Sequence, residues 1–77
     1  MPTVLRAYGY RFGFFSGDGS EPPHVHVSRG QYAVKFWLEP VRLAQNGGFR
    51  AHDLKEIAGL IEDNEQLLLE AWHEYFG

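Results

Sequence analysis

Hydrophobic and polar residues alternate along the first half of the chain, and this alternation predicts β-strands. Successive side chains of a strand point to opposite faces, so an alternating run indicates one buried and one exposed face. Tyr8-Gly9 and Arg29-Gly30 interrupt the alternation as the tight turns of hairpins do. The predicted strands cover residues 3–8, 10–16, 24–28 and 31–38. The pattern therefore predicts a four-stranded antiparallel sheet made of two consecutive hairpins.

The position of each turn fixes which residues face each other. In the first hairpin Ala7 faces Tyr10, and Arg6 faces Arg11. In the second, a turn at Arg29-Gly30 places Lys35 opposite His24 and Ala33 opposite His26. The expected inner face of the second hairpin contains Val25, Val27, Tyr32, Val34, Phe36 and Leu38, and its expected outer face contains His24, His26, Ala33, Lys35, Trp37 and Glu39.

After Pro40 the pattern changes from strand to helix. Val41 to Ala44 are expected to form one helical turn before Asn46-Gly47-Gly48 breaks it. From residue 51 apolar residues recur at helical spacing, which predicts an amphipathic helix over 51–76. The apolar phase continues through Asp63-Asn64-Glu65, which favours one long helix with a kink near residue 64 over a helix pair. The prediction is one α+β domain over residues 1–77, with the helix or helix pair packed on the apolar face of the sheet.

Composition excludes several classes of site and suggests a compartment. The chain has 77 residues and no cysteine, so disulfides and thiolate metal sites are ruled out. It has no run of about 20 apolar residues and no signal-peptide pattern, so a cytoplasmic protein without a membrane partner is expected. The net charge of -3 is unevenly distributed. Residues 1–38 hold four basic and two acidic side chains, a net of +2, whereas residues 39–77 hold three and eight, a net of -5.

The candidate chemistry lies in the run Pro22-Pro23-His24-Val25-His26-Val27, whose two histidines share one strand face. One interpretation is a metal site, because imidazole is a common ligand of zinc. A third ligand would have to come from Glu39, His52 or His73, and Lys35 opposite His24 would oppose a cation. The expectation is accordingly no metal and no cofactor.

A second interpretation also depends on Lys35. The outer face collects cationic and aromatic side chains that suit the phosphates and bases of RNA. Arg6, Arg11, Lys35 and Trp37 are the candidate RNA-binding residues, and His24, His26 and Lys35 are the candidate catalytic residues of a metal-independent ribonuclease. The plainest alternative is a solvated sheet face whose charges only keep the edges from associating.

Several motifs in order resemble a known bacterial family. They are Met1-Pro2-Thr3-Val4-Leu5-Arg6, Gly9-Tyr10, Pro22 to Val27, Lys35-Phe36-Trp37-Leu38-Glu39-Pro40, and Leu68 to Phe76. Together the chain resembles the family of domains of unknown function numbered 4160. The resemblance implies a small co-encoded partner protein, and some family members are described as the toxin of a two-gene toxin-antitoxin pair. It supplies no catalytic residues.

The sequence therefore leaves three functions open. The first is a toxin-type component that binds or cleaves RNA through the outer sheet face. The second is a non-catalytic module that binds the co-encoded partner, and the third is a histidine-based metal-binding domain. The edges of the sheet and the helix also leave room for a homodimer.

Overall fold

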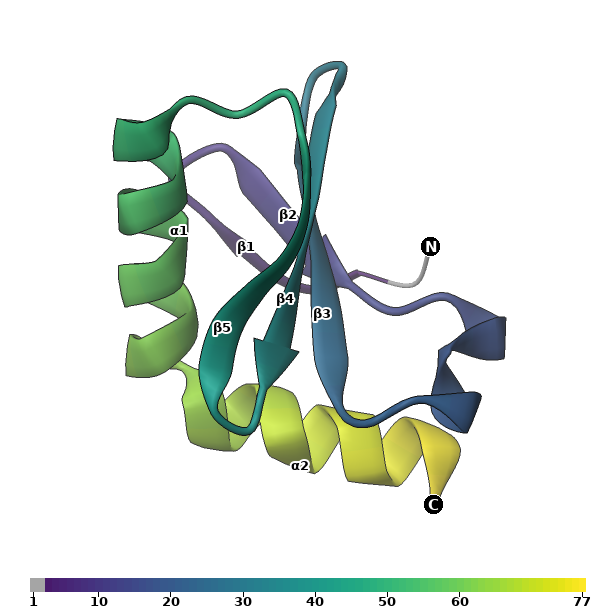
Figure 1. Ribbon diagram of the computed structural model, residues 1–77. Coiled ribbons are helices and arrows are strands. Elements are labelled where there is room, and N and C mark those ends of the chain that lie inside the picture. Colours follow the sequence, from purple (N-terminus) through teal and green to yellow (C-terminus); the bar gives the residue numbers. More distant parts are fainter. Residues whose placement is uncertain (1–2) are drawn as a thin grey trace.

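The computed structural model describes residues 3–77, so Met1 and Pro2, which open the predicted domain and its first motif, lie outside the described residues. Five antiparallel strands form one sheet in chain order, β1-β2-β3-β4-β5, and two helices follow (Figure 1). The strands are β1 (Thr3–Ala7), β2 (Tyr10–Gly13), β3 (His24–Arg29), β4 (Tyr32–Leu38) and β5 (Val41–Gly47). A 3-10 helix η1 (Ser16–Ser20) precedes β3, and the C-terminal helices are α1 (Ala51–Asp63) and α2 (Glu65–Phe76). The α+β class is confirmed, but the prediction of four strands is wrong.

The first hairpin has the predicted register. Arg6 faces Arg11 and Ala7 faces Tyr10. Tyr8 and Gly9 both adopt positive φ angles, 53° and 82°, which is the backbone of a type I′ turn. Tyr8 replaces the Asn or Asp usual at this position, and its side chain lies 79% exposed in solvent.

The second hairpin is shifted by two residues relative to the prediction. Its turn uses Gly30 and Gln31, so Arg29 faces Tyr32, His26 faces Lys35 and His24 faces Trp37. The predicted pairs of His24 with Lys35 and of His26 with Ala33 are therefore wrong. A shift of two keeps each side chain on its face, because the period of a strand is two. The predicted inner residues are accordingly buried, except for Tyr32.

Residues 41–47 form the fifth strand rather than the predicted helical turn. The chain reverses at Glu39-Pro40, so that Leu38 pairs with Val41 and β5 runs back along β4. Most of β5 is exposed, as expected of an edge strand. Its sequence lacks a clear apolar alternation because only a few of its side chains need to be covered, and the periodicity therefore missed it.

The helical segment divides at Asn64, so the prediction of one long helix is wrong. Asn64 leaves the helical backbone region, with φ -116° and ψ 18°. Its side-chain Nδ2 donates a hydrogen bond to Leu60 O at 2.8 Å, and its carbonyl accepts from Leu68 N at 2.9 Å. Because one residue ends α1 and starts α2, the apolar spacing survives the change of direction (Figure 1).

One core joins the sheet to both helices. Ile57 and Ile61 of α1 and Leu68 and Trp72 of α2 share it with the inner sheet residues, including Phe12, Val25, Val27 and Phe36. The prediction that the helical segment covers the apolar face is therefore confirmed. In the described part of the chain, no helix is both long and apolar enough to cross a membrane.

Polar contacts also tie α1 to the sheet. The Tyr10 hydroxyl donates to Glu56 Oε1 at 2.8 Å, and Arg29 Nη2 lies 3.3 Å from Asp53 Oδ1. Burial, together with the hydrogen bond to Glu56, raises the pKa of Tyr10 to about 12. The guanidinium of Arg29 stacks over the Tyr10 ring, 4.6 Å from its centroid. Arg29 thus connects the sheet to α1.

Candidate functional site

The two histidines of β3 lie side by side, as their spacing predicts. Their ring centroids are 5.2 Å apart. His26 lies between Gly13 of β2 and Lys35 of β4 in the ladder, and the Phe15 ring contacts it at a centroid distance of 4.5 Å. His26 is the more accessible histidine, with 22% of its side chain exposed.

Asp18 completes the cluster from η1. The loop Ser16–Ser20 folds back so that Asp18 Oδ1 lies 3.2 Å from His24 Nε2, and Oδ2 lies 3.0 Å from His26 Nε2. The Phe15 backbone N–H donates to Oδ2 at 2.8 Å and holds the carboxylate in place. Gly19 lets η1 approach α2 closely, since a Cβ there would lie 2.8 Å from Phe76 Cδ1. The sequence did not indicate Asp18.

His24 is buried, which corrects its predicted place on the exposed outer face. Only 1% of its surface is accessible. Trp37 packs against it across the ladder and Trp72 reaches it from α2, with ring centroids at 5.5 and 5.1 Å. His24 is the first residue of β3, so it lies at the rim of the sheet, where η1 and α2 meet it. In this position the two tryptophans close its ring off from solvent.

The ring orientation of His24 follows from one hydrogen bond. Its Nδ1 lies 2.9 Å from the carbonyl oxygen of Pro22. A carbonyl only accepts, so Nδ1 carries the proton and donates it. Nε2 faces Asp18 Oδ1: it is an acceptor in the neutral imidazole, and a second ring proton there would be donated to the carboxylate.

The Asp18 carboxyl is kept ionised by its neighbours. Burial raises its pKa, but hydrogen bonds from the Phe15 N–H and from the His26 and His24 side chains outweigh burial and lower the pKa below its ordinary value. The cluster therefore contains a fixed negative charge, only 13% exposed, between two imidazoles.

Lys35 is held by partners beside the cluster. Its Nζ donates to Glu21 Oε1 and lies 4.7 Å from the centroid of the Trp37 ring. This hydrogen bond, more than any other influence, lowers the pKa of Glu21. Glu21 therefore balances the positive charge of Lys35. The same carboxylate oxygen, Glu21 Oε1, also lies 3.9 Å from His24 Nδ1.

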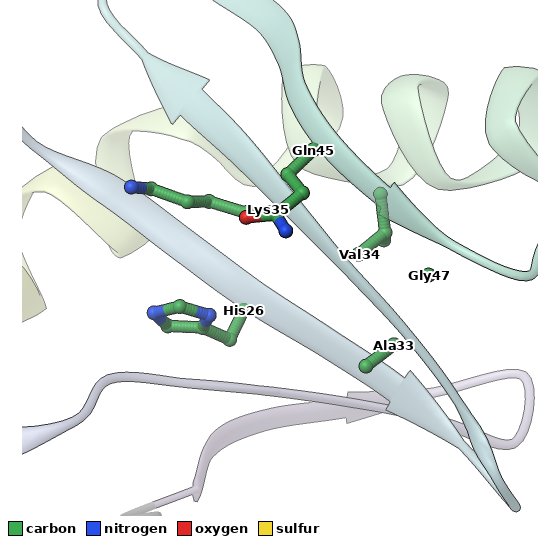
Figure 2. Close-up of a pocket in the computed structure, with 6 residues that line it drawn as sticks. All are labelled: His26, Ala33, Val34, Lys35, Gln45 and Gly47. Carbon is green, nitrogen blue, oxygen red and sulfur yellow. The ribbon is translucent and has the colours of Figure 1, made fainter.

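A shallow hollow opens next to His26 on the outer face. Its volume is about 240 Å³, and Figure 2 shows the His26 ring and the Lys35 chain extending side by side from adjacent strands. Its lining residues are His26, Ala33, Val34, Lys35, Gln45 and Gly47. The hollow exists because Ala33 and Gly47 are small, and the longer side chains of His26, Lys35 and Gln45 surround it.

A second hollow of about 270 Å³ lies at the other end of the sheet. Arg6, Arg11 and Arg29 line it together with Gly9, Tyr10, Ser28 and Gly30. Among these described lining residues none is acidic. The structure therefore divides the predicted site: His26, Lys35 and Trp37 lie near Asp18, whereas Arg6 and Arg11 lie near the hairpin turns.

The three predicted sources of a third metal ligand are all outside the cluster. His52 lies beside Asp53 on α1, and neither Glu39 nor His73 belongs to the group. Asp18 takes this place, and one donor atom each from Asp18, His24 and His26 falls within 4.8 Å of the others. The only hint in the sequence was that Asp18 precedes His24 by six residues. The sequence does not show that the loop between them folds back to bring the two side chains together.

A family model described as a domain of unknown function (DUF4160) matches residues 9–73. The chain belongs to this family. The match begins at Gly9 and covers the second hairpin turn, the histidine strand and most of α2, so it includes the motifs Gly9-Tyr10, Pro22 to Val27 and Lys35 to Pro40. No curated protein and no solved structure matches the chain.

Proposed function

We propose that this protein binds RNA through the outer face of its sheet, as the toxin-type component of a two-gene pair. The observation that supports the proposal most directly is the pair Arg6 and Arg11. They face each other across the β1-β2 ladder. Like charges directly opposite each other are unfavourable unless an anion lies between them.

The surroundings of the arginine pair also favour an anionic ligand. Within the described chain neither arginine has a carboxylate within ion-pair distance, and both are exposed. A phosphodiester in the hollow of about 270 Å³ would gain two guanidinium contacts without displacing an existing partner.

Further along the same face, other side chains could contact the rest of a bound RNA strand. Lys35 and His26 offer donors to phosphate, and the rings of Trp37 and Phe15 offer surfaces for bases. His26 is the histidine with access to a bound strand, so general acid or base chemistry at a phosphodiester belongs to His26, with Asp18 orienting its ring.

Binding of a labelled single-stranded RNA, followed by fluorescence anisotropy at several salt concentrations, tests the proposal. We expect Arg6→Ala with Arg11→Ala to weaken binding and to reduce the slope of log K against log salt by about 1.4, since each lost phosphate contact contributes about 0.7. We also expect expression of the wild-type chain to arrest growth and the double variant to relieve the arrest.

The matched control is Arg50→Ala with Lys55→Ala, which removes the same charge from exposed positions at the start of α1. Equal weakening by both double variants would show a nonspecific charge effect and contradict the proposed surface. Binding that does not respond to salt would contradict it as well.

An interaction module is the second candidate, favoured by strand β5. This strand forms an open edge of the sheet and exposes Leu43 to 44%. A co-encoded partner or a second copy of the chain can extend the sheet along such an edge. If this is the function, the arginine pair has no effect on growth, and Leu43→Lys disrupts the complex with the partner.

A further inference from the structure

We infer that Asp18, His24 and His26 form a binding site for a divalent transition-metal ion of the zinc class. The inference goes beyond RNA binding, because it concerns a metal ion at the histidine cluster, whereas the RNA-binding proposal depends chiefly on Arg6 and Arg11 at the opposite end of the outer face. Two imidazoles and a carboxylate are ligands that zinc and related ions accept together.

The first argument is the tautomer of His24. Nδ1 donates to the Pro22 carbonyl, so Nε2 of the neutral ring presents a lone pair. Nε2 lies 3.2 Å from Asp18 Oδ1. In the neutral ring this nitrogen and the carboxylate oxygen are both acceptors, so a cation must join them where His24 is only 1% exposed. A metal ion satisfies both, and a proton on Nε2 is the competing explanation.

The second argument is geometry. Ligands bound to zinc at 2.0–2.1 Å in a tetrahedron lie about 3.3 Å from each other. His24 Nε2 lies 3.2 Å from Asp18 Oδ1 and His26 Nε2 lies 3.0 Å from Oδ2, and one donor atom from each residue falls within 4.8 Å of the others. The carbonyl of Pro22 also supplies the outer hydrogen bond that orients a metal-bound imidazole. The donors need only small side-chain rotations to surround one ion.

The third argument is charge and access. Lys35, the cation that would oppose a metal, is neutralised by Glu21 and stacks on Trp37. Asp18 supplies a carboxylate between the histidines, and in the described chain no lysine or arginine pairs with it. Three protein ligands leave a fourth position open, as in zinc sites that bind an exchangeable water or substrate. His26, with its ring partly exposed beside the hollow of about 240 Å³, places the open side of the site toward the outer face.

Titration of the purified, metal-free chain with zinc chloride tests the inference. We expect calorimetry to give one zinc per chain, and the imidazole nitrogen resonances of His24 and His26 to shift at Nε2 while His24 Nδ1 keeps its proton. Asp18→Asn and His26→Ala should each weaken zinc affinity by at least about tenfold. Circular dichroism of both variants checks that the fold is retained.

The control variants remove histidines outside the cluster. His52→Ala and His73→Ala change exposed side chains and should leave zinc affinity unchanged. The absence of zinc binding by the wild type, with His24 Nε2 protonated at neutral pH, would overturn the inference in favour of a proton. Binding that persists unchanged in both Asp18→Asn and His26→Ala would overturn it too. RNA is absent from this experiment, so its outcome is separate from that of the RNA-binding test.

Discussion

At the scale of single residues, burial gives similar side chains different roles. His24 and His26 are two positions apart on one strand, yet the first is enclosed by two tryptophans and the second borders an open hollow. Arg29 is tied to Asp53, whereas Arg11 has no such partner in the described chain. These differences depend on what packs against each side chain, and residue type alone does not reveal them.

Tyr10 offers a test of burial through pH. An exposed tyrosine loses its proton near pH 10, whereas folded Tyr10 keeps it to about pH 12. Between these values the unfolded chain binds fewer protons, so the free energy of unfolding should fall as the pH rises through this interval. Tyr10→Phe should lose this component and show a flatter decline in urea unfolding series from pH 9 to 11.5.

Tyr8→Phe is the control for Tyr10, because Tyr8 is exposed. It should retain the wild-type decline. Parallel curves for Tyr10→Phe and the wild type would show that the buried phenol does not carry the effect.

At the scale of elements, the local sequence determines some hairpins and helices more completely than others. The turn at Tyr8-Gly9 fixes the first register, and that register is as predicted. The second turn contains a single glycine, and the chain shifts it by one position, moving every pair by two residues. The break at Asn64 lets α1 pack beside β5 and α2 beside β4.

Glycines in and beside the helices give a prediction at this scale. Gly59 lies inside α1, and a Cβ there meets no atom within 4 Å. Gly59→Ala should therefore raise the free energy of unfolding by about 1 kcal/mol, as expected for glycine to alanine in a helix interior. Urea unfolding followed by circular dichroism measures the change.

Gly48 provides the opposite case. Its φ is +109°, and a Cβ would lie 2.6 Å from Tyr32 Cδ1. Gly48→Ala should therefore destabilise the protein. Stabilisation by Gly48→Ala, or destabilisation by Gly59→Ala, would contradict the packing described for the loop and for α1.

At the scale of the whole molecule, the five strands and both α-helices share one core. Phe12 and Val25 from the sheet, Ile57 from α1 and Trp72 from α2 belong to the same cluster of buried side chains. A chain of 77 residues has little apolar area to spare, so losing either helix should expose much of this core.

Unfolding should accordingly be a single cooperative transition. The far-ultraviolet circular dichroism, which reports the helices and the sheet, should have the same urea midpoint as tryptophan fluorescence, which reports the surroundings of Trp37 and Trp72. Separate midpoints would show that α2 leaves the sheet before the rest unfolds.

The sequence by itself determined the type of most elements, the buried face of the second hairpin apart from Tyr32, the facing pair Arg6 and Arg11, and the shared face of His24 and His26. These follow from spacing along the chain, because a strand repeats every two residues and a helix every 3.6. The tertiary structure alone decided that Val41–Gly47 join the sheet, that the break near residue 64 separates two helices, that His24 is buried, and that Asp18 reaches both histidines. Each depends on contacts between segments that local periodicity does not relate, where packing and long-range hydrogen bonds select the path of the chain.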